Sequence, residues 1–377
     1  MRVKHILLLF SSGFLLLAGA PSVAQTSGQQ TQSSDQANGT ETVVVTAQKR
    51  KENLQDVPVP VAVIGGQTLL NNHELTFQDY YNTVPGLSIG ESGHGGEVRA
   101  AIRGIDTGAG LDPTTSVTID DVPVTGVLPQ AGSQDIPDVD PNDIERVEVL
   151  RGPQGALYGA SSMGGLIRYI TKDPSGDQFS GNLTAGTSFV QNGAEPGYEF
   201  RVSTNVPLTD NLAIRASGFT RQDPGYIDNL FGGIKGINED HAGGGRFAAM
   251  WTPSNWLSVK ISALYQDTKY DGASDVGIGL GDLQQNYPPG VGESDRKAET
   301  YSAIVTAKIG GIDLTSVTGY SINSEKDTFD FTTDFGSLAQ SIFGVPYDPV
   351  FEKVTGNIFS DELRLSGSAG DSIDWLV

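Results

Sequence analysis

The stretch Leu257-Ser258-Val259-Lys260-Ile261-Ser262-Ala263 alternates apolar and polar side chains without a break. Side chains of a β-strand point alternately to opposite faces, so Leu257, Val259 and Ile261 share one face and Lys260 lies on the other. A helix would instead repeat its apolar residues every three or four positions. The stretch therefore predicts a strand with one apolar and one polar face.

The same alternation recurs along most of the chain after Pro174. It predicts eight strands, at 177–190, 196–207, 210–222, 242–252, 255–269, 297–309, 311–324 and 356–367. Short turns join some of them, whereas long connections at about 222–239, 270–296 and 325–355 join others. Short turns at one end and long loops at the other are typical of an antiparallel transmembrane β-barrel. A soluble β-sandwich also alternates, and the pattern alone leaves that alternative open.

The first residues favour the barrel because they resemble a secretory signal peptide. Arg2 and Lys4 precede an apolar run from Ile6 to Leu17, and Ser22-Val23-Ala24 places small residues before a cleavage site. The run is shorter than the ~20 residues that span hydrocarbon. We therefore predict a signal peptide at 1–24 and export of the mature chain. No later segment reads as a spanning helix.

The last residues, Ile373 to Val377, resemble the start of a ninth strand. An open sheet with an unpaired edge cannot lie in lipid. We therefore expect residues 175–377 to be the N-terminal part of a longer, truncated barrel.

Between the N-terminal segment and the barrel, residues 48–174 predict a compact α+β domain. Its expected elements are an edge strand at 57–64, a short helix at 77–84, and strands at 98–105, 116–119, 122–124, 144–150 and 166–171. Long Gly- and Asp-rich loops separate them, and loops of this length in a small domain are usually functional.

Residues 25–40 are almost wholly polar and predict a disordered linker. The β-branched stretch Glu41 to Ala47 follows it. A strand-forming stretch on a flexible tether suits pairing with the sheet edge of a partner. It equally suits an ordinary first strand of the following domain, and the residues alone do not separate the two.

Composition excludes several classes of protein. The formal net charge is −21, which disfavours a nucleic-acid partner. There is no cysteine, hence no disulfide or thiolate metal site, and we predict no cofactor. No nucleophile elbow, phosphate-binding loop or zinc-binding helix motif occurs, and the adjacent Asp120 and Asp121 would face opposite sides of a strand. We therefore do not expect an enzyme.

The stretch IERVEVLRGPQGALYG at residues 144–159 closely resembles a signature of the TonB-dependent outer-membrane receptors. Further resemblances are GGLIRYITK at 164–172, IRG at 102–104, the segment 116–123, the TonB box at 41–47 and SDELRL at 360–365. Arg168 stands where the family usually has Asn, and Asp121 where it usually has Gly. The resemblance covers residues 41–377.

The resemblance implies an α+β plug domain at 48–174 inside a barrel of about twenty-two strands, of which this chain carries about eight. It implies an outer-membrane protein with a periplasmic N-terminus, which imports a small extracellular ligand, most often a ferric siderophore. The implied energy source is TonB of the inner membrane, pairing with Thr42, Val43, Val44, Val45, Thr46 and Ala47. Uptake of cobalamin, oligosaccharide or an aromatic compound, a passive pore and a signalling receptor remain alternatives.

In this family, plug arginines are implied to pair with glutamates of the inner barrel wall. Arg103 and Arg151 each precede a glycine, and Glu362 is the wall residue expected to meet them. Arg168 receives no predicted role.

Ligand contact is expected from outward-facing plug loops and long barrel loops. The residues selected there are Glu91, His94, Asp106, Asp112, Phe329 and Phe331. A solvated acidic loop is the alternative for each of them. No set of His, Asp and Glu has the spacing of metal ligands.

Overall fold

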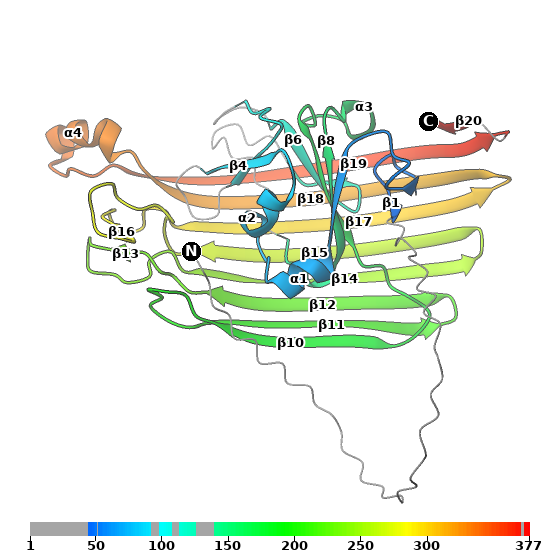
Figure 1. Cartoon of the computed structure of the whole chain (residues 1–377), viewed down its shortest axis with the longest axis horizontal. Coiled ribbons are helices and arrows are strands. Elements are labelled where there is room, and N and C mark those ends of the chain that lie inside the picture. The colour runs from blue at the N-terminus through cyan, green and yellow to red at the C-terminus, as the bar shows by residue number, and fades with distance from the viewer. Residues whose placement is uncertain (1–43, 51, 92–97, 108–112, 126–138, 371–372) are drawn as a thin grey trace, which may run out of the picture.

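The computed structural model describes residues 44–50, 52–91, 98–107, 113–125, 139–370 and 373–377 (Figure 1). The N-terminal plug packs against one face of a long antiparallel sheet, which we call the wall sheet. The predicted signal peptide and linker, together with Thr42 and Val43 of the expected TonB box, lie outside the described residues.

The wall sheet has nine strands in chain order, each hydrogen-bonded to the next. They are β10 (Ser180–Ser188), β11 (Gly197–Thr209), β12 (Leu212–Asp223), β14 (Asp240–Ser254), β15 (Leu257–Tyr270), β17 (Ser294–Ile309), β18 (Ile312–Asp330), β19 (Pro349–Ala369) and β20 (Ile373–Leu376). The register is continuous along β15 and β17, from Leu257 opposite Ala307 to Tyr270 opposite Ser294. The strands predicted from alternation are confirmed.

The two faces of the wall sheet decide between barrel and sandwich. The apolar side chains of the alternating pattern, such as Phe247, Ile261 and Phe359, are exposed, whereas the polar face carries Arg246 and Lys260 and is covered by the plug. A sandwich would bury its apolar face against a second sheet. An apolar outer face with a polar inner face is the arrangement of a barrel in lipid.

Aromatic side chains form a row on the exposed face. Tyr301 lies opposite Tyr320, and Tyr320 lies opposite Phe359, on three adjacent strands. Trp251 and Trp256 are exposed close to the short turn between β14 and β15. Two aromatic girdles on either side of an apolar band mark the membrane interfaces of such barrels.

The plug is built on a five-stranded sheet with the order β3-β8-β9-β6-β7. Its strands are β3 (Val61–Gly65), β6 (Thr115–Ile119), β7 (Val122–Pro123), β8 (Ile144–Arg151) and β9 (Gly165–Thr171), with β6 parallel to β9. A separate pair joins β4 (Leu87–Glu91) to β5 (Val98–Ile102), and another joins β1 (Val44–Val45) to β2 (Glu52–Asn53). The strand predicted at 57–64 is an edge strand, as expected, but it begins only at Val61, so Pro58 and Pro60 precede it.

Helices are short in this fold. They are α1 (Gly66–Asn72), α2 (Phe77–Tyr80), α3 (Gly155–Tyr158), α4 (Thr332–Phe343) and the 3₁₀ turns η1 (Tyr81–Thr83) and η2 (Pro141–Asp143). At the start of α2 the Thr76 N–H donates to the Asp79 carboxylate at 2.8 Å, as in a capping box. No helix of the described residues is long and apolar enough to cross a bilayer.

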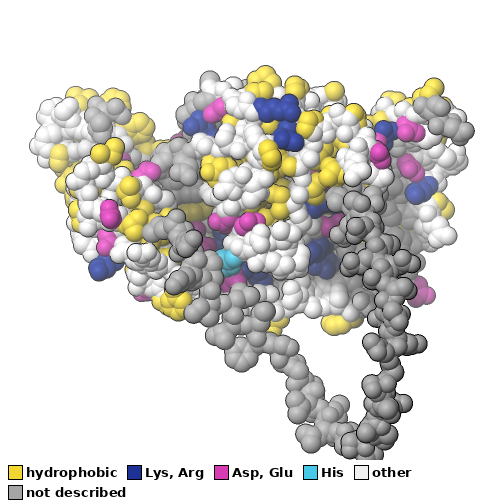
Figure 2. Space-filling model, in the orientation of Figure 1, with side chains coloured by type: hydrophobic (Ala, Val, Ile, Leu, Met, Phe, Trp, Pro, Cys, Tyr) yellow, Lys and Arg dark blue, Asp and Glu magenta, His cyan; other side chains and the backbone are white. Residues whose placement is uncertain are grey.

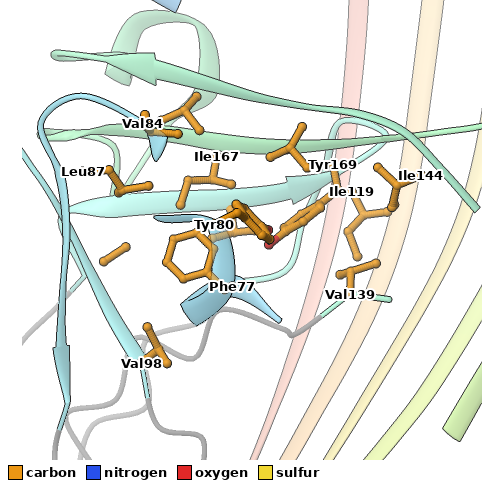
Figure 3. Close-up of a cluster of buried hydrophobic side chains, with 14 of the residues drawn as sticks. Phe77, Tyr80, Val84, Leu87, Val98, Ile119, Val139, Ile144, Ile167 and Tyr169 are labelled. Carbon is orange, nitrogen blue, oxygen red and sulfur yellow. The ribbon is translucent and has the colours of Figure 1, made fainter. Parts of the chain in front are cut away.

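The plug core lies between its sheet and α2 (Figure 3). Phe77 and Tyr80 meet edge to face, with ring centres 5.4 Å apart, and the Tyr80 hydroxyl lies 2.8 Å from that of Tyr169 on β9. This core fixes the orientation of β9 and of the β6–β7 turn beside it, and both carry residues of the site described below.

The structure differs from the sequence expectations at three helices. α1 and α3 were not predicted, and α4 lies within a segment expected to be a connection. α1 and α3 have seven and four residues, too few to establish a helical period. β18 and β19 are also longer than predicted, because they continue beyond the apolar band, where alternation no longer marks them.

Gly319 tests how closely the plug and the wall sheet are packed. A Cβ atom at this position of β18 would lie 2.5 Å from Val122 Cγ1 and 2.9 Å from Ser360 Oγ. We expect Gly319→Val to destabilise plug docking by about 1–3 kcal/mol, since overpacking forces backbone shifts. Thermal unfolding and protease resistance of the purified protein would measure this effect. Gly218→Val is the control, because its nearest neighbours are 3.6 and 4.0 Å away; equal behaviour of both variants would contradict tight packing.

Candidate functional site

The face of the plug that meets the wall sheet is acidic, and the wall residues that meet it are basic. Asp140 accepts from Arg201 Nη2 at 2.9 Å, and Asp143 is held by Arg215 at 2.5 Å and Arg246 at 2.6 Å. These cations come from three adjacent strands, β11, β12 and β14. Charged side chains are seldom buried unless they are paired, and this complementarity satisfies that requirement.

Two aspartates at the β6–β7 turn carry the acidic face further along the wall. Asp120 lies 3.2 Å from Lys260 Nζ on β15 and 3.8 Å from Arg246. Asp121 lies 3.0 Å from Arg364 on β19. The adjacent carboxylates thus contact well-separated strands of the wall sheet.

The backbone of this turn is unusual. Asp120 has φ 49° and Asp121 has φ 71°, both in the left-handed region. Two residues with positive φ are what a tight two-residue hairpin requires, and Gly or Asn usually supplies the second. Asp121 stands where the family usually has Gly. Asp adopts this conformation less readily than Gly, but it supplies a carboxylate.

The charged neighbours keep both aspartates ionised. Burial raises the pKa of Asp120, but Lys260, Arg246 and the hydrogen bonds from Thr171 outweigh it, so the net shift is downward. Burial likewise opposes ionisation of Asp121, yet Arg168, Lys49 and Arg364 hold its pKa well below the usual range. The plug therefore presents carboxylates, not carboxylic acids, to the wall at neutral pH.

The expected pairing of Glu362 with Arg103 or Arg151 is replaced by another. Glu362 lies 3.1 Å from Lys49 Nζ and 3.4 Å from Arg364 Nε. Arg151 donates to the Pro85 carbonyl at 3.0 Å within the plug, and the Arg103 side chain is exposed. The reason is positional: β19 meets the plug at the β6–β7 turn, whereas Arg151 is the last residue of β8. A docking role for Arg103 and Arg151 elsewhere stays a prediction.

The described part of the expected TonB box, Val44 to Ala47, is packed onto the plug. β1 pairs with β2, and Val45 and Ala47 are buried against Leu150 and Leu166. This small cluster is separate from the main plug core. Of the two readings of the sequence, the structure contains an ordinary first strand here; pairing with a partner would require it to detach.

Polar contacts hold the same segment, and Arg168 is their centre. Its Nη1 donates to Thr46 Oγ1 at 2.9 Å and to Glu148 at 2.7 Å, while Nη2 lies 2.8 Å from Asp121. The Thr46 N–H also donates to Glu148, at 3.2 Å. Arg168, for which the sequence predicts no role, lies directly opposite Glu148 on the paired strands β9 and β8.

Lys49 and Tyr158 complete this arrangement. The Tyr158 hydroxyl donates to the Ala47 carbonyl at 2.9 Å, and Lys49 Nζ lies 4.2 Å from the Tyr158 ring centre. Burial and the neighbouring carboxylates raise the Tyr158 pKa despite Arg168, so the hydroxyl remains a donor. Lys49 also lies 3.4 Å from Asp121 and 3.1 Å from Glu362. One connected network therefore joins residues 46–49, the plug sheet and β19.

The residues selected for ligand contact are dispersed. Phe329 and Phe331 lie near α4 with ring centres 6.4 Å apart, and Asp106 is exposed, 3.8 Å from Arg99. His94 and Asp112 lie outside the described residues, and Glu91 is described only as the end of β4. A cavity of about 510 Å³ separates α1 from β10 and β11, with amide and hydroxyl side chains such as Asn71, Asn182 and Thr184 in its lining.

The structure also brings together three potential metal ligands that sequence spacing did not indicate. Donor atoms of Glu239, His241 and Asp271 lie within 4.8 Å of one another. His241 Nε2 is 2.9 Å from Glu239, and Asp271 is 2.5 Å from Lys269, so each carboxylate already has a partner.

Comparison with known proteins finds a matching domain and several relatives. Residues 53–166 match the model of the TonB-dependent Receptor Plug Domain. The chain is 31% identical over 202 residues to the iron-regulated outer membrane virulence protein of Vibrio cholerae, covering 51% of this chain and 29% of that protein. It is 32% identical over 190 residues to the ferric enterobactin receptor of Pseudomonas aeruginosa, covering 48% and 25%. The matches thus span about a quarter to a third of these relatives.

Solved structures share the fold. The ferric yersiniabactin uptake receptor FyuA from Yersinia pestis superposes with a TM-score of 0.66 at 20% identity, over 84% of this chain and 47% of that chain. FpvA of P. aeruginosa gives 0.66 at 18% identity, over 88% and 43%. These structures show a shared fold, and the match over residues 53–166 shows that the chain carries the plug domain of the TonB-dependent receptors.

The Asp120–Lys260 contact can be measured by a double-mutant cycle with Asp120→Asn and Lys260→Met. We expect a coupling energy of about 1–3 kcal/mol in plug docking, because the pair is buried and shares partners. Thermal unfolding of the four proteins gives the value. Strict additivity would show that the contact contributes nothing to docking.

The lowered pKa of Asp120 also predicts a pH dependence of docking, because the cations that lower it most, Lys260 and Arg246, belong to the wall sheet. A carboxyl whose pKa is lower in the docked state stabilises docking above its ordinary value of about 3.9, and that stabilisation is lost as the pH falls through the docked pKa. Plug protease resistance should therefore be constant from about pH 7 to 5 and decline below about pH 4. An Asp120→Asn protein should lose less on acidification than the parent, and an equal loss would contradict this assignment.

Restoring the family's usual residue, Arg168→Asn, tests the hold on residues 46–49. We expect Thr46 to become more accessible, because Asn cannot reach Thr46, Glu148 and Asp121 together. A thiol introduced as Thr46→Cys would report this as faster maleimide labelling, with Arg168→Lys giving a smaller increase because Lys lacks the planar fork of Arg. Since Thr46→Cys itself removes the Thr46 hydroxyl, the comparison is made among proteins that all carry it. Unchanged labelling would contradict the role of Arg168.

Proposed function

We propose that the protein imports a small extracellular ligand across the outer membrane, driven by TonB. The observation that carries the proposal is the network joining residues 46–49 to the acidic turn and to β19. A partner that pairs with residues 42–47 must first detach them from Glu148, Arg168 and Tyr158. Detachment removes partners from the same charges that hold the plug to the wall.

The proposed arrangement has a cleaved signal peptide at 1–24, a linker at 25–40, the TonB box at 41–47, the plug at 48–174 and wall strands from 175. The N-terminal segment would lie in the periplasm with the short strand turns, and the long loops would face outward. This orientation follows the general layout of outer-membrane barrels.

Relatives suggest the kind of cargo. Among the proteins matched are a ferric enterobactin receptor of P. aeruginosa, a hemin receptor of Yersinia pestis and a vitamin B12 transporter of Vibrio vulnificus. An iron complex is accordingly the first ligand class to examine. No response of transcription to iron starvation would argue against it. The sequence leaves three alternatives. Import of another nutrient would also need TonB, a passive pore would not, and a signalling receptor need not transport its ligand.

Deleting residues 42–47 from the natural protein should abolish ligand-dependent growth or uptake while leaving the protein in the outer membrane. The physical reason is loss of the strand that a partner's sheet edge can pair with. Deleting six residues of the linker, 30–35, is the matched control and should have little effect. Uptake that survives loss of 42–47 would favour a passive pore.

A further inference from the structure

The ends of the wall strands opposite the short turns carry a cluster of aromatic rings. We call Phe231, Phe329, Phe331, Phe335 and Tyr347 the aromatic rim. Ring centres are 6.4 Å apart for Phe329 and Phe331, 6.1 Å for Phe331 and Phe335, and 5.6 Å for Phe231 and Tyr347. Phe331, Phe335 and Tyr347 are exposed. Figure 2 shows hydrophobic side chains gathered at the end of the molecule that carries α4.

Hydrogen bonds order the connections that carry the rim. Within the connection between β18 and β19, the Phe331 N–H donates to the Asp348 carbonyl and the Asp348 N–H to Thr332 Oγ1, both at 3.0 Å. β13 (Asp228–Asn229) pairs with β16 (Gln284–Gln285), tying the loop of Phe231 to the next long loop. The rings are thus positioned in advance, and ordering them on binding costs less than ordering free side chains.

The charge around the rim is predominantly negative. Residues 271–295 and 327–352 contain carboxylates but no Lys, Arg or His, and Lys235 is the single basic residue from 223 to 240. Arg296, which follows residues 271–295 directly, lies 2.6 Å from Glu325 and 3.9 Å from Asp327. Two carboxylates therefore neutralise it. A surface with this balance repels anions and attracts cations.

We propose that the aromatic rim binds a small aromatic ligand that is neutral or cationic, and that it discriminates against anions. Exposed rings supply offset or edge-to-face contacts to an aromatic partner and cation–π contacts to a cation. The surrounding carboxylates supply the selection against negative charge. This rests on the proposed function, because only an importer with these loops outward would receive its ligand here. It narrows the ligand from an iron complex in general to one without net negative charge, or to an aromatic compound that carries no iron.

The test uses three naphthalene probes that differ in charge: naphthol, naphthylmethylammonium and naphthalenesulfonate. Their fluorescence is titrated with the natural full-length protein in a non-ionic detergent at low salt. We expect the neutral and cationic probes to bind and the anionic probe to bind at least about tenfold more weakly. Added salt should weaken the cationic probe's binding and should improve that of the anionic probe, since both effects are electrostatic.

Variants locate the binding. The double change Phe331→Ala with Phe335→Ala should weaken binding of the neutral probe by about tenfold, the loss of two ring contacts. Phe359→Ala is the matched control, because that ring is also exposed but lies on the outward face of β19. Asp348→Lys should strengthen binding of the anionic probe, and the hydrogen bonds of Asp348 to Phe331 and Thr332 use only its backbone atoms.

Several outcomes would overturn the proposal. They are tighter or equal binding of the anionic probe, no binding of any probe, and equal effects of the Phe331/Phe335 and Phe359 variants. Probe binding needs no TonB, so a failure here leaves the 42–47 deletion result standing. Conversely, uptake that is independent of residues 42–47 would leave the binding result standing.

Discussion

The β6–β7 turn, Asp120-Asp121, is the constraint on which the position of the plug depends. Both residues have positive φ, a conformation that Asp adopts at some cost. The cost is tolerated because each carboxylate meets a different set of partners: Lys260, Arg246 and Thr171 for Asp120, and Arg364, Lys49 and Arg168 for Asp121. One turn thus connects the plug to β14, β15 and β19 and to the N-terminal segment.

The polarity of this interface bears on how the plug can move. Replacing buried ion pairs by well-packed apolar residues is often neutral or stabilising, so the presence of these pairs does not by itself imply strong plug docking. Removing one partner of a buried pair is costly, whereas in a network a carboxylate can keep one cation while it leaves another, as Asp120 lies near both Lys260 and Arg246. An interface of carboxylates and guanidinium groups therefore fixes one position accurately and still permits separation without exposing a large apolar surface.

How far the sequence predicts this structure depends on the range of the interactions. Alternation found the wall strands because Leu257 to Ala263 and their counterparts report only which face is apolar, a local property. The signature at 144–159 placed the plug. The partners in plug docking could not be predicted. Asp120 and Lys260, like Lys49 and Glu362, are far apart in sequence, and no pattern along the chain pairs them. Arg168 was visible as a departure from the family, yet its meaning required knowing that Thr46 lies beside it.

The buried apolar side chains form two separate clusters, which bears on what happens when the N-terminal segment is pulled. Val45 and Ala47 belong to the small cluster with Leu150 and Leu166, whereas Phe77, Tyr80 and Tyr169 form the main core. Detaching the N-terminal segment therefore breaks the contacts of the small cluster and leaves the main core packed. A force pulling on this segment would detach it before the plug unfolds, so detachment and unfolding are separate transitions that require different free energies.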